Sequence, residues 1–308
     1  MKMSLTIKHL IGLHGVPSDD IQTILDTAKT FREVLERPIK KVPTLQGKTI
    51  VNLFYEDSTR TRISFELAEK RLSADTINFS KSGSSTKKGE TFKDTIRNIE
   101  AMKVDMIVVR HESAGVPQFL TRISKASIIN AGDGRHEHPT QALLDMYSIR
   151  ERLGKLKGLK ICVIGDIAHS RVALSNIFGL QTMGAQVSVC GPLTMIPQNI
   201  ESLGVKIYTD ISKAISENDV LNVLRIQLER KAGTSIPTLR EYHNYFGITA
   251  ERIEKNNKDI LILHPGPINR GVEITSEVAD GPYQIILDQV TNGVAIRMSV
   301  LYLLGTRQ

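Results

Sequence analysis

Short apolar runs alternate with amphipathic stretches along most of the chain. The stretches repeat their apolar residues at helical spacing, as in Asp19–Arg37, for which Ser18 is the expected N-cap. The apolar runs are rich in β-branched residues, which is typical of buried strands: Ile50–Tyr55, Met106–Arg110, Ser127–Ala131, Lys160–Gly165, Gln186–Cys190, Val220–Leu224 and Asp259–Leu263. Because apolar strands separated by helices must be covered on both faces, this pattern predicts an α/β fold with mainly parallel sheets flanked by helices.

A polar, glycine-containing segment, Leu153–Gly158, interrupts this alternation. A second strand–helix series begins directly after it, at Leu159. The last pattern, Pro282–Leu304, has helical spacing and predicts a closing helix. We therefore expect two α/β domains linked by helices, with these boundaries: residues 1–153, completed by the terminal helix 286–308, and residues 154–285.

Composition indicates a soluble globular protein. Of the 308 residues, 41% are hydrophobic and 24% are charged. No apolar run approaches the roughly 20 residues of a membrane span, and Met1–Leu10 lacks the features of a signal peptide. Cys162 and Cys190 lie far apart in apolar runs, so we expect buried, reduced thiols in a cytoplasmic protein that does not bind membranes.

The net charge of +7 raises the question of nucleic-acid binding. The basic residues are scattered, no run of them reaches five, the chain has no Trp, and aromatic residues make up only 5%. An RNA-binding module would need side chains that stack on bases, and its affinity would depend strongly on salt. We expect no nucleic-acid partner and attribute the surplus to a solvated surface and to anion-binding arginines.

The clearest chemical signal is Ser58-Thr59-Arg60-Thr61-Arg62, which joins a predicted strand to a predicted helix. Backbone N–H groups and the positive end of the helix dipole point out of such a turn. Arginine adds fork-shaped donors that match an oxyanion. The turn therefore predicts a phosphate site without the glycines of a P-loop.

Two common nucleotide motifs are absent. Gly165-Asp166-Ile167-Ala168-His169 follows a predicted strand but is not G-x-G-x-x-G, which disfavours a dinucleotide. Gly47-Lys48-Thr49 resembles the end of a Walker A loop. That motif requires glycine at position 42 and a helix after the loop, but this chain has Val42 and a predicted strand.

The segment Asp133–Gln141 contains His136, Glu137 and His138, which could bind a metal ion. Their spacing is not H-E-x-x-H, and no second cluster of suitable residues is evident. A zinc hydrolase using His136 and His138 remains an alternative that metal analysis and chelator resistance would test. His138 also precedes a predicted helix, where a neutral imidazole can donate a hydrogen bond to a carbonyl.

Three further groups follow predicted strands or lie in a polar loop: Ser84 with Lys87-Lys88-Gly89-Glu90, Arg225-Ile226-Gln227, and His264-Pro265-Gly266-Pro267. Together with Ser58–Arg62, Arg110-His111, His138-Pro139-Thr140-Gln141 and Asp166 with Arg171, they resemble the carbamoyltransferase family along nearly the whole chain. The lysine loop, Arg-x-Gln and His-Pro-Gly-Pro favour the members that use aspartate. Ornithine enzymes typically carry His-Cys-Leu-Pro late in the chain, and this sequence does not.

The resemblance implies that residues 1–153 bind carbamoyl phosphate. The residues at its phosphate are Ser58, Thr59, Arg60 and Thr61, with Arg110 assisting. The residues at its carbamoyl group are Thr61, Arg110 and His138 at the oxygen, and Gln141 near the amide. Ser84 and Lys88 come from the neighbouring subunit of a homotrimer, so that the active sites are shared.

The resemblance also implies that residues 154–285 bind L-aspartate. Arg171 and Arg225 take its two carboxylates, Gln227 lies nearby, and Lys88 engages both substrates. The backbone of Gly266 and Pro267 meets the substrate amine, although Gly266 departs from the Leu of some members. Glu56 matches a carboxylate that pairs with Arg171 and Arg230 when the domains close.

The implied reaction transfers the carbamoyl group of carbamoyl phosphate to the amine of L-aspartate, giving N-carbamoyl-L-aspartate and phosphate for pyrimidine biosynthesis. Donors at the carbamoyl oxygen stabilise the developing oxyanion, and binding orients the amine. Neither a metal nor an organic cofactor is expected. The sequence leaves open whether a regulatory chain or a dihydroorotase partner binds the trimer. Another amine, such as that of ornithine, is the alternative acceptor.

Overall fold

A computed structural model describes residues 4–80, 91–226, 238–256 and 259–307. The chain forms two compact units: the first comprises Met1–Tyr147 and Thr291–Gln308, and the second comprises Ser148–Val290. It passes between them in two helices, α5 (Pro139–Leu153) and α11 (Ile286–Gly305). The division therefore falls inside these helices, a few residues from the boundaries at 153/154 and 285/286 that the sequence suggests.

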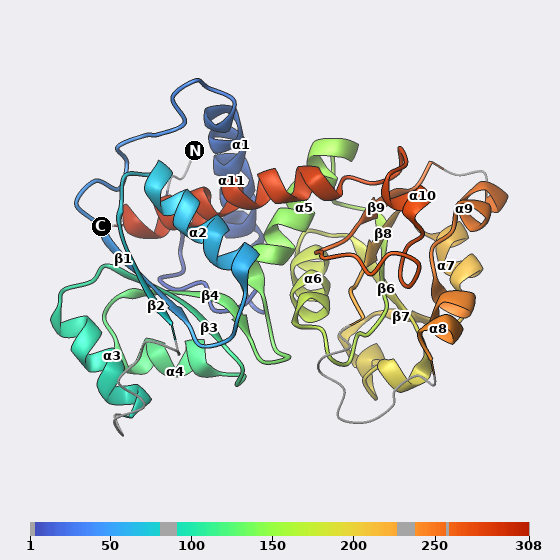
Figure 1. Cartoon of the computed structure of the whole chain (residues 1–308), viewed down its shortest axis with the longest axis horizontal. Coiled ribbons are helices and arrows are strands. Elements are labelled where there is room, and N and C mark those ends of the chain that lie inside the picture. Colours follow the sequence, from blue (N-terminus) through green and yellow to red (C-terminus); the bar gives the residue numbers. More distant parts are fainter. Residues whose placement is uncertain (1–3, 81–90, 227–237, 257–258, 308) are drawn as a thin grey trace. The chain divides into compact units, whose positions relative to one another are not determined.

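The first unit is built on a four-stranded parallel sheet with the order β2-β1-β3-β4 (Figure 1). Its strands are β1 (Thr49–Phe54), β2 (Asp75–Ser80), β3 (Met106–His111) and β4 (Ser127–Asp133). The apolar runs predict β1, β3 and β4. They do not predict β2, because this edge strand carries the polar residues Thr76 and Asn78.

Helices cover both faces of this sheet. On one face, α3 (Phe92–Ala101) and α4 (Val116–Ile123) contribute Ile96, Ile99 and Leu120 to a buried cluster with Val51 and Val109 of the strands. On the other face lie α1 (Ser18–Leu35), α2 (Thr59–Arg71) and α11 (Figure 1). Helix α1 begins at Ser18 with Pro17 as its N-cap, so the expectation that Ser18 caps it is wrong by one residue.

The second unit has a five-stranded parallel sheet with the order β7-β6-β5-β8-β9. Its strands are β5 (Lys160–Ile164), β6 (Gln186–Cys190), β7 (Lys206–Tyr208), β8 (Val220–Val223) and β9 (Leu261–Leu263). Its helices are α6 (Arg171–Thr182), α7 (Ile211–Glu217), α8 (Leu239–Phe246), α9 (Ala250–Asn256) and α10 (Ser276–Ala279). The two sheets confirm the predicted α/β class.

Strand order creates one switch point in each sheet. In the first, β1 lies between β2 and β3, so the connections that follow β1 and β3 leave the sheet in opposite directions. In the second, β5 lies between β6 and β8. Ligands of open parallel sheets bind at the carboxyl ends of such strands. The two switch points are therefore where binding residues are expected.

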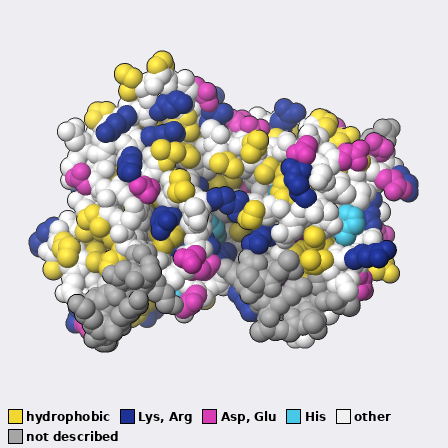
Figure 2. Space-filling model, in the orientation of Figure 1, with side chains coloured by type: hydrophobic (Ala, Val, Ile, Leu, Met, Phe, Trp, Pro, Cys, Tyr) yellow, Lys and Arg dark blue, Asp and Glu magenta, His cyan; other side chains and the backbone are white. Residues whose placement is uncertain are grey.

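Within the described residues, no helix is long and apolar enough to cross a membrane. Cys162 on β5 and Cys190 on β6 are buried free thiols. Figure 2 shows that Lys and Arg side chains on the face drawn there are dispersed, with acidic side chains among them. The described part of that face therefore has no extended basic stripe of the kind that tracks a nucleic-acid backbone.

Candidate active site

The predicted phosphate turn lies at the switch point of the first sheet. Strand β1 ends at Phe54, and α2 begins at Thr59 with Ser58 as its N-cap residue. The Ser58 side chain makes no capping hydrogen bond within the described residues, and the first turn of α2 contains no acidic residue. The positive end of the helix dipole is therefore not offset by an acidic side chain in the first turn, which favours binding of an anion there.

Arg110 lies beside this turn at the end of β3. Its backbone pairs in register with Phe54, and its carbonyl accepts a hydrogen bond from Tyr55 N at 2.9 Å. Its guanidinium donates to the Ala131 carbonyl at 3.1 Å and to Glu56 Oε1 at 2.8 Å. Since Arg110 is only 9% exposed, these contacts hold the guanidinium at the end of β1.

A second buried arginine lies behind α2. Arg297 of α11 donates to Ser64 Oγ at 2.9 Å and lies 5.1 Å from the centre of the Phe65 ring. Burial, together with the charge of Arg110, lowers the pKa of Arg297 to about 10. The guanidinium still carries its charge at neutral pH, so it adds positive potential beneath the helix that begins at the predicted phosphate turn.

His138 and Gln141 lie at the start of α5, and both are nearly buried. The backbone N of Gln141 donates to the His138 carbonyl at 3.0 Å, and its side-chain Nε2 donates to Asp145 Oδ1 at 3.0 Å. The first helical turn therefore orients both residues. His138 is preceded by the segment that links β4 to α5, which carries a dense polar network.

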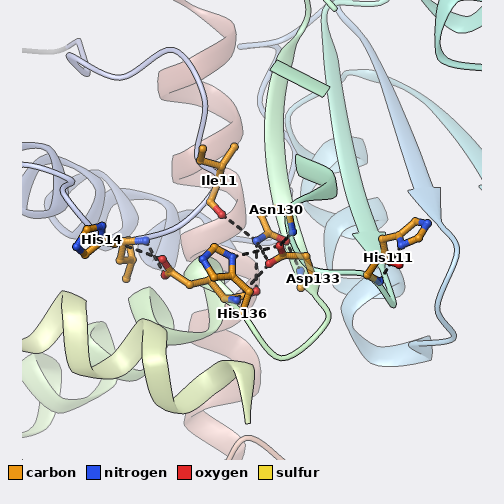
Figure 3. A network of polar contacts seen from close by, with 11 residues as sticks. Ile11, His14, His111, Asn130, Asp133 and His136 are labelled. Atoms are coloured by element: carbon orange, nitrogen blue, oxygen red, sulfur yellow. Dashed lines mark hydrogen bonds and ion pairs between the residues drawn. The ribbon is translucent and has the colours of Figure 1, made fainter. Parts of the chain in front are cut away.

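Asn130 is the centre of this network (Figure 3). Its Nδ2 donates to the Ile11 carbonyl at 2.9 Å, to Asp133 Oδ1 at 2.8 Å and to the Glu137 carbonyl at 3.2 Å. Burial would raise the pKa of Asp133, but hydrogen bonds from His136, Gly115 and Asn130 outweigh it, so the pKa lies below its usual value. The carboxylate is thus a charged anchor for the loop before His138.

The same contacts bear on the zinc alternative. His136 Nδ1 lies 3.2 Å from Asp133 Oδ2, and this hydrogen bond raises the pKa of the imidazole. The Glu137 carboxylate accepts from Leu13 N at 2.7 Å and from His14 N at 3.3 Å. Across the described part of the chain, no three His, Cys, Asp or Glu side chains form a group that could hold a metal ion.

At the switch point of the second sheet, two of the predicted arginines follow β5 and β8. Arg171 is the first residue of α6, is 4% exposed, and follows Ser170, which caps the helix by accepting from Ala173 N. Asp166, just after β5, lies with Oδ1 2.8 Å from His169 Nδ1. Arg225 follows β8 and is half-buried. Both arginines are thus at the carboxyl side of neighbouring strands.

The His264–Pro267 segment follows β9 and is tied down at its start. His264 N donates to Gln289 Oε1 at 3.0 Å, and Gly266 N donates to His264 Nδ1 at 2.8 Å. Gly266 has φ of 61°, in the left-handed region that favours glycine. This backbone conformation gives a physical reason for Gly at a position where some family members have Leu.

Four residues that the resemblance singles out lie outside the described residues: Ser84, Lys88, Gln227 and Arg230. Ser58, Thr59, Arg60, Thr61, Arg110, His138 and Gln141 all belong to the first unit. Arg171, Arg225, Gly266 and Pro267 all belong to the second. Glu56, expected to pair with Arg171 on closure, has Arg110 of its own unit as a partner in the structure.

Sequence reasoning did not identify several residues that shape these sites: Arg297 and Asn130 in the first unit, and Asn269 and Glu273 in the second. It considered Glu137 only as a possible metal ligand. Each has at least one hydrogen-bond partner far away in the chain, such as Ser64 for Arg297 and Leu13 for Glu137. Local spacing carries no signal of such pairs.

Two family models match this chain nearly end to end. The aspartate/ornithine carbamoyltransferase carbamoyl-P binding domain matches residues 8–151, and the aspartate/ornithine carbamoyltransferase Asp/Orn binding domain matches residues 157–304. The chain therefore belongs to the aspartate/ornithine carbamoyltransferase family, which confirms the resemblance read from its motifs.

Its relatives narrow the class further. The aspartate carbamoyltransferase catalytic subunit of Cytophaga hutchinsonii is 62% identical, with 98% of each chain covered. Among solved structures, aspartate transcarbamoylase from Trypanosoma cruzi in complex with N-(phosphonacetyl)-L-aspartic acid has a TM-score of 0.86 at 29% identity, covering 96% of this chain and 95% of that one. Ornithine carbamoyltransferase from Pyrococcus furiosus has the same TM-score of 0.86 at 28% identity, covering 99% of each chain. Backbone similarity alone thus does not separate the two acceptors, whereas sequence identity points to aspartate.

Proposed function

We propose that this protein transfers the carbamoyl group of carbamoyl phosphate to the amine of L-aspartate, giving N-carbamoyl-L-aspartate and phosphate. The observation that carries the proposal is the switch point of the first sheet. There the Ser58–Thr61 turn follows β1, and Arg110 lies near the end of the neighbouring strand β3. The name of the Cytophaga hutchinsonii relative supports aspartate as the acceptor.

In this proposal the first unit binds carbamoyl phosphate. The backbone N–H groups at the start of α2, the hydroxyls of Ser58, Thr59 and Thr61, and the Arg60 guanidinium receive the phosphate. Arg110 and the buried charge of Arg297 strengthen the positive potential there. This unit therefore suits a dianionic phosphate ester or anhydride.

The chemical step needs a donor set at the carbamoyl oxygen. As the aspartate nitrogen forms its bond to the carbamoyl carbon, negative charge develops on that oxygen, and Arg110, His138 and Thr61 donate to it. Gln141 orients the amide. The bond from carbon to the phosphate oxygen then breaks, the electron pair leaves with phosphate, and the proton that the attacking nitrogen loses goes to the departing phosphate. Removing one such donor should slow the reaction about a hundredfold.

The second unit binds L-aspartate in this proposal. Arg171 and Arg225 take its two carboxylates, with Gln227 nearby, and the backbone of Gly266 and Pro267 meets its amine. Two arginines at one switch point suit a substrate with two carboxylates, because each guanidinium can form a bidentate pair. Ornithine, which has one carboxylate and a cationic side chain, would leave one arginine facing a positive charge.

We further propose a cytoplasmic homotrimer in which Ser84 and Lys88 reach the active site of the neighbouring subunit, with no metal or organic cofactor. The test of the reaction is phosphate release from carbamoyl phosphate with L-aspartate or L-ornithine as acceptor, in the presence and absence of a chelator. Release with aspartate alone, unaffected by the chelator, supports the proposal. Preference for ornithine would show that ornithine, not aspartate, is the acceptor. Loss of activity on chelation would favour the alternative of a zinc enzyme.

A further inference from the structure

Glu273 is a buried carboxylate in the second unit whose side chain joins two separate loops. It is 0% exposed, and its own carbonyl accepts a hydrogen bond from Ile248 N at 2.8 Å, which anchors its backbone. Burial raises the pKa of this carboxyl, and hydrogen bonds from Ile226 and Asn269 oppose that effect. Burying a carboxylate costs free energy unless hydrogen bonds from the protein replace those it loses to water.

The carboxylate accepts three hydrogen bonds from two residues. Oε1 accepts from Ile226 N at 2.7 Å and from Asn269 Nδ2 at 2.7 Å, and Oε2 accepts from Asn269 N at 2.8 Å. Asn269 Nδ2 also donates to the Ile226 carbonyl at 3.1 Å. Glu273 and Asn269 together therefore hold both backbone polar groups of Ile226.

Ile226 directly follows Arg225, the residue proposed to bind an aspartate carboxylate. Its side chain is 1% exposed and packs with Met195 and Tyr242. Because its side chain, its N–H and its carbonyl are all held, the backbone of Ile226 has little freedom to rotate. The direction in which Arg225 leaves the end of β8 is set by that backbone.

Asn269 belongs to the second loop, which follows β9 and contains Gly266 and Pro267. Its beginning is fixed by His264, through the bond to Gln289 and the bond from Gly266 N. The contacts of Asn269 with Glu273 fix its other end. One carboxylate thus sets the spacing between the loop that carries Arg225 and the loop proposed to meet the substrate amine.

We propose that Glu273, with Asn269, is a positioning residue for aspartate: it holds the β8 and β9 loops in the relative position that aspartate binding needs, without touching the substrate. This inference rests on the proposed function. It predicts that loss of Glu273 weakens the binding of aspartate alone, since the residues proposed to bind carbamoyl phosphate lie in the other unit. If Glu273 had only a general structural role, its loss would weaken the binding of both substrates.

The test is steady-state kinetics of Glu273→Gln and Asn269→Ala in the full-length protein. Glutamine has a single acceptor oxygen, so at least one of the three hydrogen bonds is lost. The expected result for each variant is a rise of about tenfold in the KM for aspartate, with the KM for carbamoyl phosphate within about twofold of the parent value. Asn269→Ala leaves the buried carboxylate intact, so it tests the same clamp if Glu273→Gln does not fold.

The matched control is Asn218→Ala, in the same unit but just before β8, at the opposite end of that strand. Asn218 is 2% exposed and accepts from Ser188 Oγ at 3.0 Å, so the substitution also removes a buried hydrogen bond. It should leave both KM values unchanged. Folded Glu273→Gln and Asn269→Ala variants with parental KM for aspartate, or with equal changes in both KM values, would overturn the inference. A parent enzyme that does not carbamoylate aspartate would instead refute the proposed function.

Discussion

Glu69 offers a sharp test of the electrostatics of α2, the helix whose first turn we propose to bind phosphate. It lies on α2, is 0% exposed, and accepts from Asn52 Nδ2 of β1 at 2.9 Å. Burial, partly offset by hydrogen bonds from Asn52 and Thr76, raises the pKa of Glu69 from 4.5 to about 7. The folded protein therefore keeps a proton on this carboxyl over a pH range in which the unfolded chain has lost it.

The sign and size of the effect follow from this difference. Between pH 4.5 and 7 the folded state binds more protons than the unfolded state, so the free energy of unfolding falls as the pH rises through that window. The pKa difference of 7 − 4.5, about 2.5, corresponds to about 3 kcal/mol at about 1.4 kcal/mol per unit. That stabilisation is complete below pH 4.5 and absent above pH 7.

Glu69→Gln should remove this pH dependence. The amide is uncharged at every pH, and its carbonyl oxygen can still accept from Asn52 Nδ2. We expect the variant to be about 2–3 kcal/mol more stable than the parent at pH 8.5 and about equal to it at pH 4.5. Urea unfolding of both proteins at pH 4.5, 6, 7 and 8.5 measures the difference directly.

Glu66→Gln on the same helix is the matched control. Glu66 is half-buried, and its hydrogen bond from Lys70 at 2.6 Å lowers the pKa of the carboxyl. The substitution should therefore be neutral or destabilising at pH 8.5, the opposite of the effect at Glu69. If Glu69→Gln shifts stability by the same amount at pH 4.5 and pH 8.5, Glu69 titrates normally and the argument from burial is wrong.

Three further predictions concern catalysis. Arg60→Ala should lower kcat/KM for carbamoyl phosphate about a hundredfold, and Arg60→Lys should recover little of it, because an ammonium lacks the fork of donors; near-native kinetics of the lysine variant would exclude a bidentate role. Arg225→Ala should raise the KM for aspartate far more than that for carbamoyl phosphate, whereas equal effects would argue against the division of substrates between the two units. Lys88→Ala and His138→Ala should each be almost inactive, yet regain activity when dissociated and reassembled together, because a mixed trimer can hold one site without either substitution. Mixed trimers that stay inactive would show that Lys88 does not serve a neighbouring subunit.

The alternation of apolar runs and helical stretches was sufficient to predict the α/β class. Strands such as β1 and β5 are buried on both faces, so most of their residues are apolar and the signal is local. Two of the four edge strands, β2 and β7, were not predicted, whereas the edge strands β4 and β9 were. Thr76 and Asn78 make β2 polar, and β7 has only three residues, Lys206–Tyr208. An edge strand that is polar or partly solvated, as β2 and β7 are, loses the pattern by which buried strands are recognised.

The strand–helix junction that carries the proposed phosphate turn was also predicted from the sequence, because Ser58–Arg62 concentrates its donors between an apolar run and a helical pattern. What the sequence did not contain was the strand order, which makes the ends of β1 and β3 neighbours and so brings Arg110 beside that turn.

The roles of Glu69, Glu273 and Arg297 likewise required the tertiary structure. Nothing in the neighbouring letters marks these three residues as buried: Glu69, for example, stands directly before Lys70 and Arg71. Ile226 and Glu273 are separated by 47 residues, and only folding brings the donor and the carboxylate to 2.7 Å. Residues that are neighbours in the sequence determine local chemistry, whereas burial and long-range pairing depend on which surfaces the whole chain packs together.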